Sequence, residues 1–136
     1  MMDEDFVVWS DEYSVQFAPI DEQHKRLAAL ANDLLKSCKE GSGVSKMDFM
    51  LSFSKASEYA ITHFRDEEDY MKKANYPDFD AHKKEHESFL AEVKSAFSKF
   101  KESDTAPIDL AVFLKKWLLN HIAVKDKLYA PYLAKL

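Results

Sequence analysis

Apolar residues recur at intervals of three and four along four separate segments of the chain, and this spacing constrains the fold more than any other feature. In an α-helix such intervals place side chains on one face, whereas a half-buried strand requires strict alternation. The segments 19–40, 44–73, 78–102 and 107–130 each carry one such stripe. The pattern predicts four amphipathic helices that bury one face each in a shared core.

Short stretches of helix-breaking residues separate the four segments. Both glycines of the chain lie within 41–43, residues 75–78 have the composition of a turn, and Pro107 suits the first position of a helix. Because short connections favour antiparallel neighbours, we expect an all-α, up-down-up-down antiparallel four-helix bundle. Residues 1–18 are expected to form an extended N-terminal arm, and Asp21 is expected to cap the first helix.

Size and charge limit the classes of protein that the chain can belong to. A length of 136 residues predicts a single domain spanning 1–136. The net charge of -5 provides no clustered positive field, so neither nucleic acid nor an anionic membrane is an expected partner. No apolar stretch approaches the roughly 20 residues of a membrane span, Cys38 is the single cysteine, and the first residues are acidic. We therefore expect a soluble, cytoplasmic protein. A monomer is preferred separately, since no feature of the sequence sets the oligomeric state.

The five histidines all fall on the apolar stripes, where imidazoles are expensive to bury. A lone core histidine is commonly satisfied by a hydrogen bond. Five unpaired imidazoles, at about 1 to 3 kcal/mol each, would rival the roughly 5 to 15 kcal/mol net stability of a domain. Bound metal ions would compensate this penalty directly. The candidate ligands are His24, His63, His82, His86 and His121.

Two carboxylates share these stripes. His82 and His86 are four residues apart, within about 40° of each other around a helix, and His63 and Glu67 repeat this spacing. His121 and Asp126 are five apart, a rotation of about 140° that leaves the role of Asp126 open. Ordinary surface positions are expected for the neighbouring charged residues, namely Asp66, Glu68, Asp69, Lys125 and Lys127.

The number of ligands is consistent with a pair of iron ions. With about six ligands per ion, two ions offer about twelve positions. Five imidazoles, two bridging carboxylates and one bridging oxygen would occupy all but one of them. A small ligand could bind at the position that remains open.

These residues resemble the hemerythrin family in its bacterial single-domain form, over the span from Trp9 to about Tyr132. One departure is the stretch 16–19, Gln-Phe-Ala-Pro, where relatives commonly contain a glycine. The resemblance rests on five linked motifs in order: Ile20-Asp21-Glu22-Gln23-His24-Lys25; His63-Phe64-Arg65-Asp66-Glu67-Glu68 with Met71; Tyr76-Pro77 followed by His82-x3-His86; Trp117-Leu118-x2-His121; and Asp126.

The resemblance implies reversible binding of molecular oxygen at a non-haem di-iron centre, for storage, delivery or sensing. It implies that the five histidines are iron ligands, and that Glu67 and Asp126 bridge the two ions together with an oxo or hydroxo group. It also implies an oxygen pocket, with Tyr129 near Asp126. The expected lining of that pocket is Leu27, Phe64, Trp117 and Leu118.

Three other functions compete with oxygen binding. A ferritin-like di-iron enzyme needs Glu-x-x-His pairs, which the sequence lacks, and a histidine-rich apolar site offers no acid or base for an oxidase. We therefore expect no enzyme, with turnover of nitric oxide or peroxide as the alternative. A redox or oxygen sensor acting on a signalling partner is the second rival, although sensor versions usually sit in longer chains. A zinc protein is the third rival, but the His-Glu-x-x-His motif of zinc peptidases is absent from the sequence.

Overall fold

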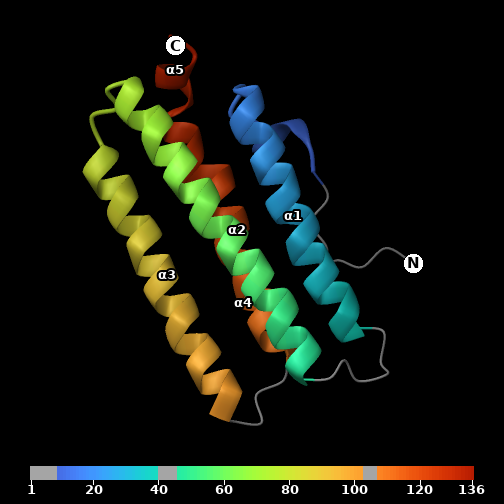
Figure 1. Cartoon of the computed structure of the whole chain (residues 1–136). Helices are drawn as coiled ribbons and strands as arrows, with labels where there is room; N and C mark the ends of the chain where they lie inside the picture. The colour runs from blue at the N-terminus through green and yellow to red at the C-terminus, as the bar shows by residue number, and fades with distance from the viewer. Residues whose placement is uncertain (1–8, 40–45, 103–106) are drawn as a thin grey trace.

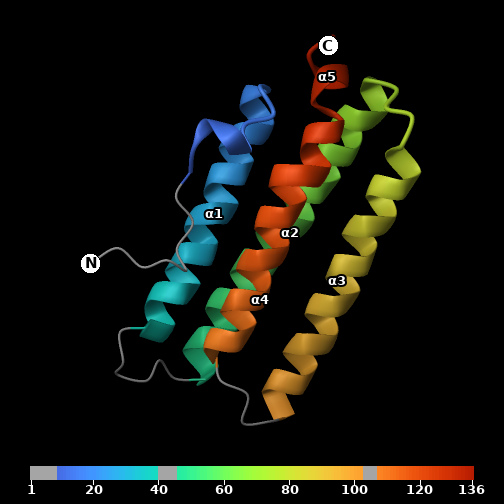
Figure 2. The same ribbon diagram turned by 180° about the vertical axis from the view of Figure 1, so that it is seen from behind.

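The computed structural model describes residues 9–39, 46–102 and 107–136, and its long elements are all helices. They are α1 (Ala18–Lys39), α2 (Lys46–Lys73), α3 (Phe79–Glu102) and α4 (Pro107–Asn120), and a short α5 (Ala130–Leu133) follows near the C-terminus. No strand occurs among the described residues. Successive long helices run in opposite directions side by side (Figures 1 and 2), which is the predicted up-down-up-down bundle.

The four long helices surround one apolar core. Helix α1 packs against α2 and α4, and α3 packs against the same two helices from the other side (Figure 2). At the end of the bundle away from α5, Phe49 and Phe53 of α2 meet Phe97 and Phe100 of α3, with ring centroids 5.4 Å apart for Phe49 and Phe100. The stripes predicted from the sequence therefore face this shared interior.

A second apolar cluster closes the end of the bundle that carries α5. It joins the N-terminal arm, the start of α1, the end of α2 and the C-terminal segment. Its buried members are Val15, Ile20, Met71, Tyr76, Tyr129 and Leu133. This cluster lies between solvent and the polar residues described below.

Asp21 ties the N-terminal arm to α1, and the prediction that it caps the helix is wrong. Because α1 begins at Ala18, Asp21 already lies inside its first turn. Its carboxylate accepts hydrogen bonds from the Ser14 hydroxyl at 2.6 Å and the Val15 N–H at 2.9 Å. The arm is not wholly extended, since residues 11–13 form a 3-10 turn, and its residues 1–8 lie outside the described part.

The departure at 16–19 has a local structural solution. Gln16 has a φ of 56°, in the left-handed region that favours glycine. Its N–H donates to the Ser14 hydroxyl oxygen at 2.9 Å, and that hydroxyl donates in turn to Asp21. These bonds hold the strained residue in place, so the arm reaches α1 without a glycine.

Asn75 lies two residues after the end of α2 and has a φ of 56°, the conformation that often follows the last turn of a helix. The N–H of Tyr76 donates to the carbonyl of Met71 at 3.0 Å, and both side chains are buried in the second cluster. The other two predicted breaks, at 41–43 and 103–106, lie outside the described residues.

The expected helix over 107–130 is not a continuous α-helix. Helix α4 ends at Asn120, and the chain continues as a π-helical turn (η2, His121–Lys125) and a 3-10 turn (η3, Asp126–Leu128) before α5. Pro131 occupies the first turn of α5, where its missing N–H is tolerated. None of the helices described is both long and apolar enough to cross a membrane.

The packing predicts a clear contrast between two leucines. Leu35 is fully buried in the core, whereas Leu51 of α2 is 58% exposed. We expect Leu35→Ala to lower the free energy of unfolding by about 2 to 5 kcal/mol and Leu51→Ala to change it by less than about 0.5 kcal/mol. Urea denaturation of the metal-free chain measures both, and equal effects would contradict this packing.

Candidate metal centre

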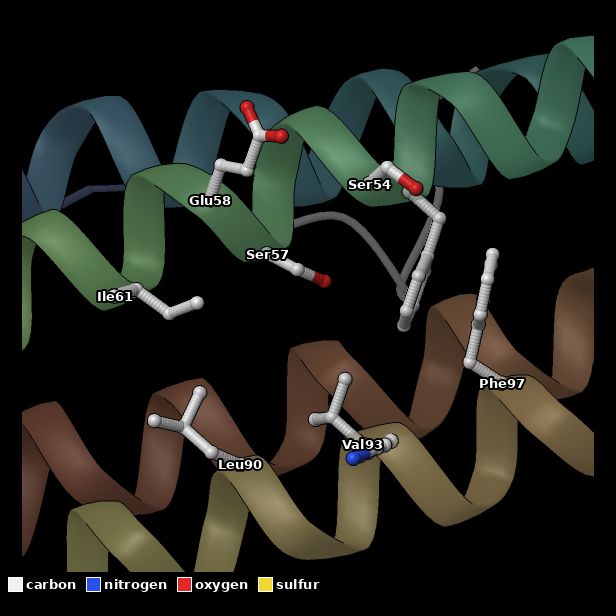
Figure 3. A pocket seen from close by; sticks show the side chains of 9 residues that line it. Ser54, Ser57, Glu58, Ile61, Leu90, Val93 and Phe97 are labelled. Carbon is white, nitrogen blue, oxygen red and sulfur yellow. The ribbon is translucent and has the colours of Figure 1, made fainter.

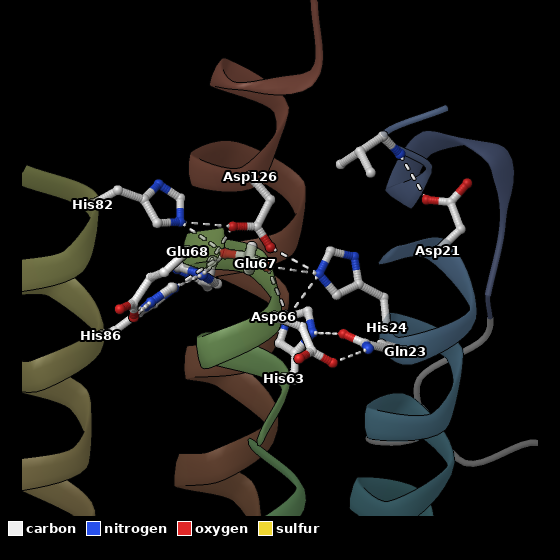
Figure 4. Close-up of polar contacts among 12 residues, drawn as sticks. Asp21, Gln23, His24, His63, Asp66, Glu67, Glu68, His82, His86 and Asp126 are labelled. Atoms are coloured by element: carbon white, nitrogen blue, oxygen red, sulfur yellow. Dashed lines mark hydrogen bonds and ion pairs between the residues drawn. The ribbon is translucent and has the colours of Figure 1, made fainter. Parts of the chain in front are cut away.

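Seven buried side chains with metal-binding atoms converge near the end of the bundle that carries α5. None of the seven is more than 5% exposed. The labelled histidines in Figure 4 point toward Glu67 and Asp126 from three sides. The set comprises His24 of α1, His63 and Glu67 of α2, His82 and His86 of α3, and His121 and Asp126 from the chain after α4. The structure thus brings together every candidate ligand predicted from the sequence.

The ligand atoms form two groups that share both carboxylates. Within each group the atoms lie within 4.8 Å of one another. The two-histidine group contains His24 and His63, and the three-histidine group contains the other three. Glu67 and Asp126 belong to both. Each group has the donors for one ion.

Each shared carboxylate directs one oxygen toward each group. Oε2 of Glu67 lies 2.8 Å from Nε2 of His63, and Oε1 lies 2.9 Å from Nε2 of His82. Oδ2 of Asp126 lies 2.9 Å from Nε2 of His24, and Oδ1 lies 2.9 Å from Nε2 of His121. A carboxylate placed in this way can contact two cations at once.

The π-helical turn η2 brings His121 and Asp126 to the same side of the chain. The N–H of Asp126 bonds to the carbonyl of His121, five residues earlier, so this turn contains one residue more than an α-helical turn. Residues five apart then lie above one another, which the rotation of about 140° in an α-helix would prevent. This local change resolves the spacing that left Asp126 open in the sequence.

Hydrogen bonding within the cluster is incomplete in a way that fits bound cations. The Nε2 atoms of His24 and His63 lie 3.1 Å apart, and those of His86 and His121 lie 3.0 Å apart. Both oxygens of Asp126 lack a hydrogen-bond partner despite their short distances to histidine nitrogens. Unpartnered buried polar atoms are uncommon. Converging imidazole and carboxylate donors suit iron or another transition metal.

In the metal-free chain the carboxylates favour protonated histidines. Burial alone would lower the pKa of His24, but the nearby Asp126 and Glu67 carboxylates outweigh it and raise the pKa to about 9. The same balance raises the pKa of His82 to about 9. Burial and the charge of Glu67 oppose ionisation of Asp126, yet His121 and His24 hold its pKa well below the usual range. Metal binding must displace the histidine protons, so it weakens as pH falls.

Gln23 orients one histidine from outside the cluster. Its Oε1 lies 2.7 Å from Nδ1 of His63, and its amide nitrogen donates to Oδ2 of Asp66 at 2.7 Å. With Nε2 of His63 facing the cluster, we assign the ring proton to Nδ1 as the donor to Gln23. Asp66 therefore interacts with Gln23, and the prediction of an ordinary surface position for it is wrong.

Two glutamates lie beside outer nitrogens of the three-histidine group. Oε2 of Glu68 lies 2.9 Å from Nδ1 of His86, and Oε1 of Glu85 lies 3.6 Å from Nδ1 of His121. The side chain of Glu68 is 18% exposed, so the prediction that it is ordinary surface charge is also wrong. Because these contacts join residues far apart in sequence, no local pattern could have identified them.

Aromatic residues cover the core side of the cluster. The ring of Phe64 stacks on His86 with centroids 3.9 Å apart, and Trp117 stacks on His121 at 4.6 Å. Together with Leu27 and Leu118, and with further apolar residues, they line an enclosed cavity of about 10 Å³. That volume is at the lower limit for one water-sized molecule. All four residues predicted to line an oxygen pocket thus surround one apolar space.

Tyr129 lies beside the cluster, where the family resemblance led us to expect it. It is fully buried, its ring lies 5.5 Å from that of His82, and its hydroxyl has no hydrogen-bond partner among the described residues. Burial, together with the charge of Asp126, raises the pKa of this phenol well above its usual value. Tyr129 is therefore a neutral group at any ordinary pH.

The larger hollow on the bundle lies elsewhere. A groove of about 390 Å³ lies between α2 and α3. In Figure 3 the side chains of Ile61, Leu90 and Val93 face the space between the two helices. Its lining includes none of the candidate ligands. The candidate ligands therefore lie in the buried cluster and not in this groove.

The bundle and its cluster define a protein that holds cations inside a four-helix fold, and comparisons with known proteins agree. Residues 17–133 match the family model of the hemerythrin HHE cation binding domain. A bacteriohemerythrin of Clostridium acetobutylicum is 33% identical, over 90% of this chain and 97% of the relative. The myohemerythrin of Sipunculus nudus is 30% identical, over 90% and 89%.

Solved structures give the same result. A crystal structure of wild-type hemerythrin matches with a TM-score of 0.83 and 30% identity, over 94% of this chain and 98% of that chain. Since the family model spans most of the sequence and the relatives match over nearly their whole length, the chain belongs to the hemerythrin family.

The spacing of five residues between His121 and Asp126 predicts an unusual sensitivity to chain length. Insertion of one alanine after residue 123 would place the two residues six apart, a rotation of about 240° in an α-helix, and would turn Asp126 away from His121. After loading with iron, we expect metal analysis to find at most about half the metal of the wild type, while circular dichroism still reports a helical protein. Leu128→Ala changes a 58% exposed side chain without changing the length, so it should keep the wild-type metal content; full loading of the insertion variant would show that the spacing is dispensable.

Proposed function

We propose that the chain binds two iron ions and, through them, binds molecular oxygen reversibly. The observation that carries the proposal is the placement of Glu67 and Asp126, each with one oxygen in either group. His24 and His63 would hold one ion, and His82, His86 and His121 the other. The two carboxylates and an oxo or hydroxo group would bridge them. When bound, the reduced iron pair supplies the electrons for reversible oxygen binding.

The unequal number of histidines assigns the open position to one ion. With about six ligands per ion, three imidazoles, two carboxylate oxygens and the bridging oxygen would complete the ligand set of the three-histidine ion. The two-histidine ion has one imidazole fewer, so its open position would receive oxygen. Leu27 lies on α1, three residues after His24, and lines the apolar cavity. The cavity is therefore bordered by the helix that carries one histidine of the two-histidine group.

The residues around the cavity favour binding over turnover. Leu27, Phe64, Trp117 and Leu118 exclude water, and the residues that line the cavity include no acid or base. An oxidase or peroxidase would need such a group to move protons to its substrate. We therefore propose an oxygen-binding protein and not an enzyme; nitric oxide or peroxide turnover, or redox sensing through a signalling partner, remains the alternative.

We also propose that residues 1–136 form a single domain that acts as a monomer. We propose in addition that neither nucleic acid nor an anionic membrane is a partner, because the net charge of -5 gives no positive field to attract them. Sedimentation equilibrium of the iron-loaded chain tests the oligomeric state.

The absorption spectrum of the iron-loaded chain tests the function. The protein is reduced without oxygen, exposed to air and then placed under vacuum, alongside a metal count. A visible charge-transfer band that appears with oxygen and fades under vacuum, with two irons per chain, supports reversible binding. Immediate conversion to a stable oxidised form, or rapid consumption of nitric oxide or peroxide, supports the alternative instead.

Leu118 should protect the oxygen-loaded site from oxidation. Leu118 is 5% exposed and lines the apolar cavity. Its replacement by alanine would enlarge the cavity enough to admit water, and we expect autoxidation to accelerate by about tenfold or more. Stopped-flow absorption measures the rate. Leu35→Ala removes the same volume from the core away from this cavity, so it should leave the rate unchanged; equal rates in both variants and the wild type would remove this role from Leu118.

A further inference from the structure

The two groups of ligands differ in the charge that surrounds them. Outer partners of metal-bound histidines tune the metal, because a carboxylate that accepts the Nδ1–H of an imidazole makes that imidazole a stronger electron donor. A neutral amide in the same place increases the electron donation of the imidazole less than a carboxylate does. The charge of these partners therefore affects the potential at which each ion loses an electron.

Carboxylates stand behind the three-histidine group. Glu68 lies 2.9 Å from Nδ1 of His86, and Glu85 lies 3.6 Å from Nδ1 of His121. Lys125 lies 3.8 Å from Glu85 and offsets part of its charge. For Glu68 the ion pairs found among the described residues involve His86 alone. Glu68 is thus the stronger electrostatic partner of the two.

A neutral partner stands behind the two-histidine group. Nδ1 of His63 faces the amide oxygen of Gln23 at 2.7 Å, so the carboxylate of Asp66 acts only through the intervening amide. Nδ1 of His24 has no hydrogen-bond partner in the described part of the chain. On the side of the N-terminal arm, the ring of Trp9 lies near His24, with centroids 6.5 Å apart. Among residues 9–39, 46–102 and 107–136, no carboxylate is thus paired with the outer nitrogen of either histidine.

We propose that Glu68, assisted by Glu85, lowers the reduction potential of the three-histidine ion below that of the two-histidine ion. Glu68 is a positioning residue in this role, since it acts through His86. The inference rests on the proposed pair of iron ions. Oxidation removes one electron from each ion in turn, and the three-histidine ion becomes ferric first. The ion without an open position thereby becomes the readier electron donor, and the ion with the open position stays ferrous longer.

An electrochemical titration tests the proposal on the iron-loaded full chain. The electrode takes up each electron in the presence of mediators and without oxygen, and electron paramagnetic resonance measures the mixed-valent form with one ferric and one ferrous ion. Wild type should show two one-electron steps. In Glu68→Gln the side chain keeps an acceptor oxygen but loses its charge. We expect the equilibrium constant for forming the mixed-valent state to fall about tenfold, equivalent to about 59 mV less separation between the steps.

Two further variants make the result specific. Glu87→Gln removes the same charge from an exposed position next to His86 and should leave the separation unchanged. Gln23→Glu combined with Asp66→Asn places a carboxylate behind His63 while keeping a donor for it, and it should also narrow the separation. This reciprocal variant decides the question if Glu68→Gln loads iron poorly.

The outcomes distinguish this inference from the proposed function. Fewer than two irons per chain in the wild type would overturn the proposed function and the inference with it. Two irons that are oxidised in a single step, or two clear steps whose separation is unchanged in Glu68→Gln or narrowed equally in Glu87→Gln, would overturn only the inference.

Discussion

The burial of charged and polar ligand side chains in the middle of an apolar bundle is the constraint on which the rest of the structure depends. Glu67 and Asp126 are fully buried, and five imidazoles surround them. Two carboxylates in such a place are tolerated only with cations beside them, either protons on the histidines or metal ions. The second apolar cluster and the hydrogen bonds that hold the N-terminal arm to Asp21 keep water from that end of the cluster.

The two sides of the cluster have different physical characters, and the proposed function uses both. Toward the core, Phe64 and Trp117 stack on the histidine rings and Leu118 completes a dry cavity. A small apolar ligand suits this side. Away from it, Gln23, Glu68 and Glu85 face outer ring nitrogens and extend the network toward half-exposed positions. The apolar side would control what reaches the ions, and the polar side would control how readily each ion gives up an electron.

The sequence alone determined the helical class, the number of long helices and the inward placement of all five histidines. These features follow from local periodicity, because residues three and four apart share a helix face whatever the helix later packs against. The same periodicity placed Glu67 on the inward face of its helix, four residues after His63. The family resemblance supplied the expected pocket residues, and the structure gathers Leu27, Phe64, Trp117 and Leu118 around one cavity.

The tertiary structure alone decided three further features. The resemblance implied Asp126 as a ligand, but only the structure shows how it reaches the cluster: η2 contains one extra residue per turn, which the α-helical rotation of about 140° could not reveal. Asp21 binds the arm instead of capping α1, since the helix starts earlier than Pro19 and Asp21 suggested. Asp66 and Glu68 were expected at ordinary surface positions, yet both have partners on other helices. Glu85, for which the sequence made no prediction, lies beside His121 of a distant segment. Periodicity assigns a residue to a face of its own helix, but contacts between distant segments exist only once the helices have packed.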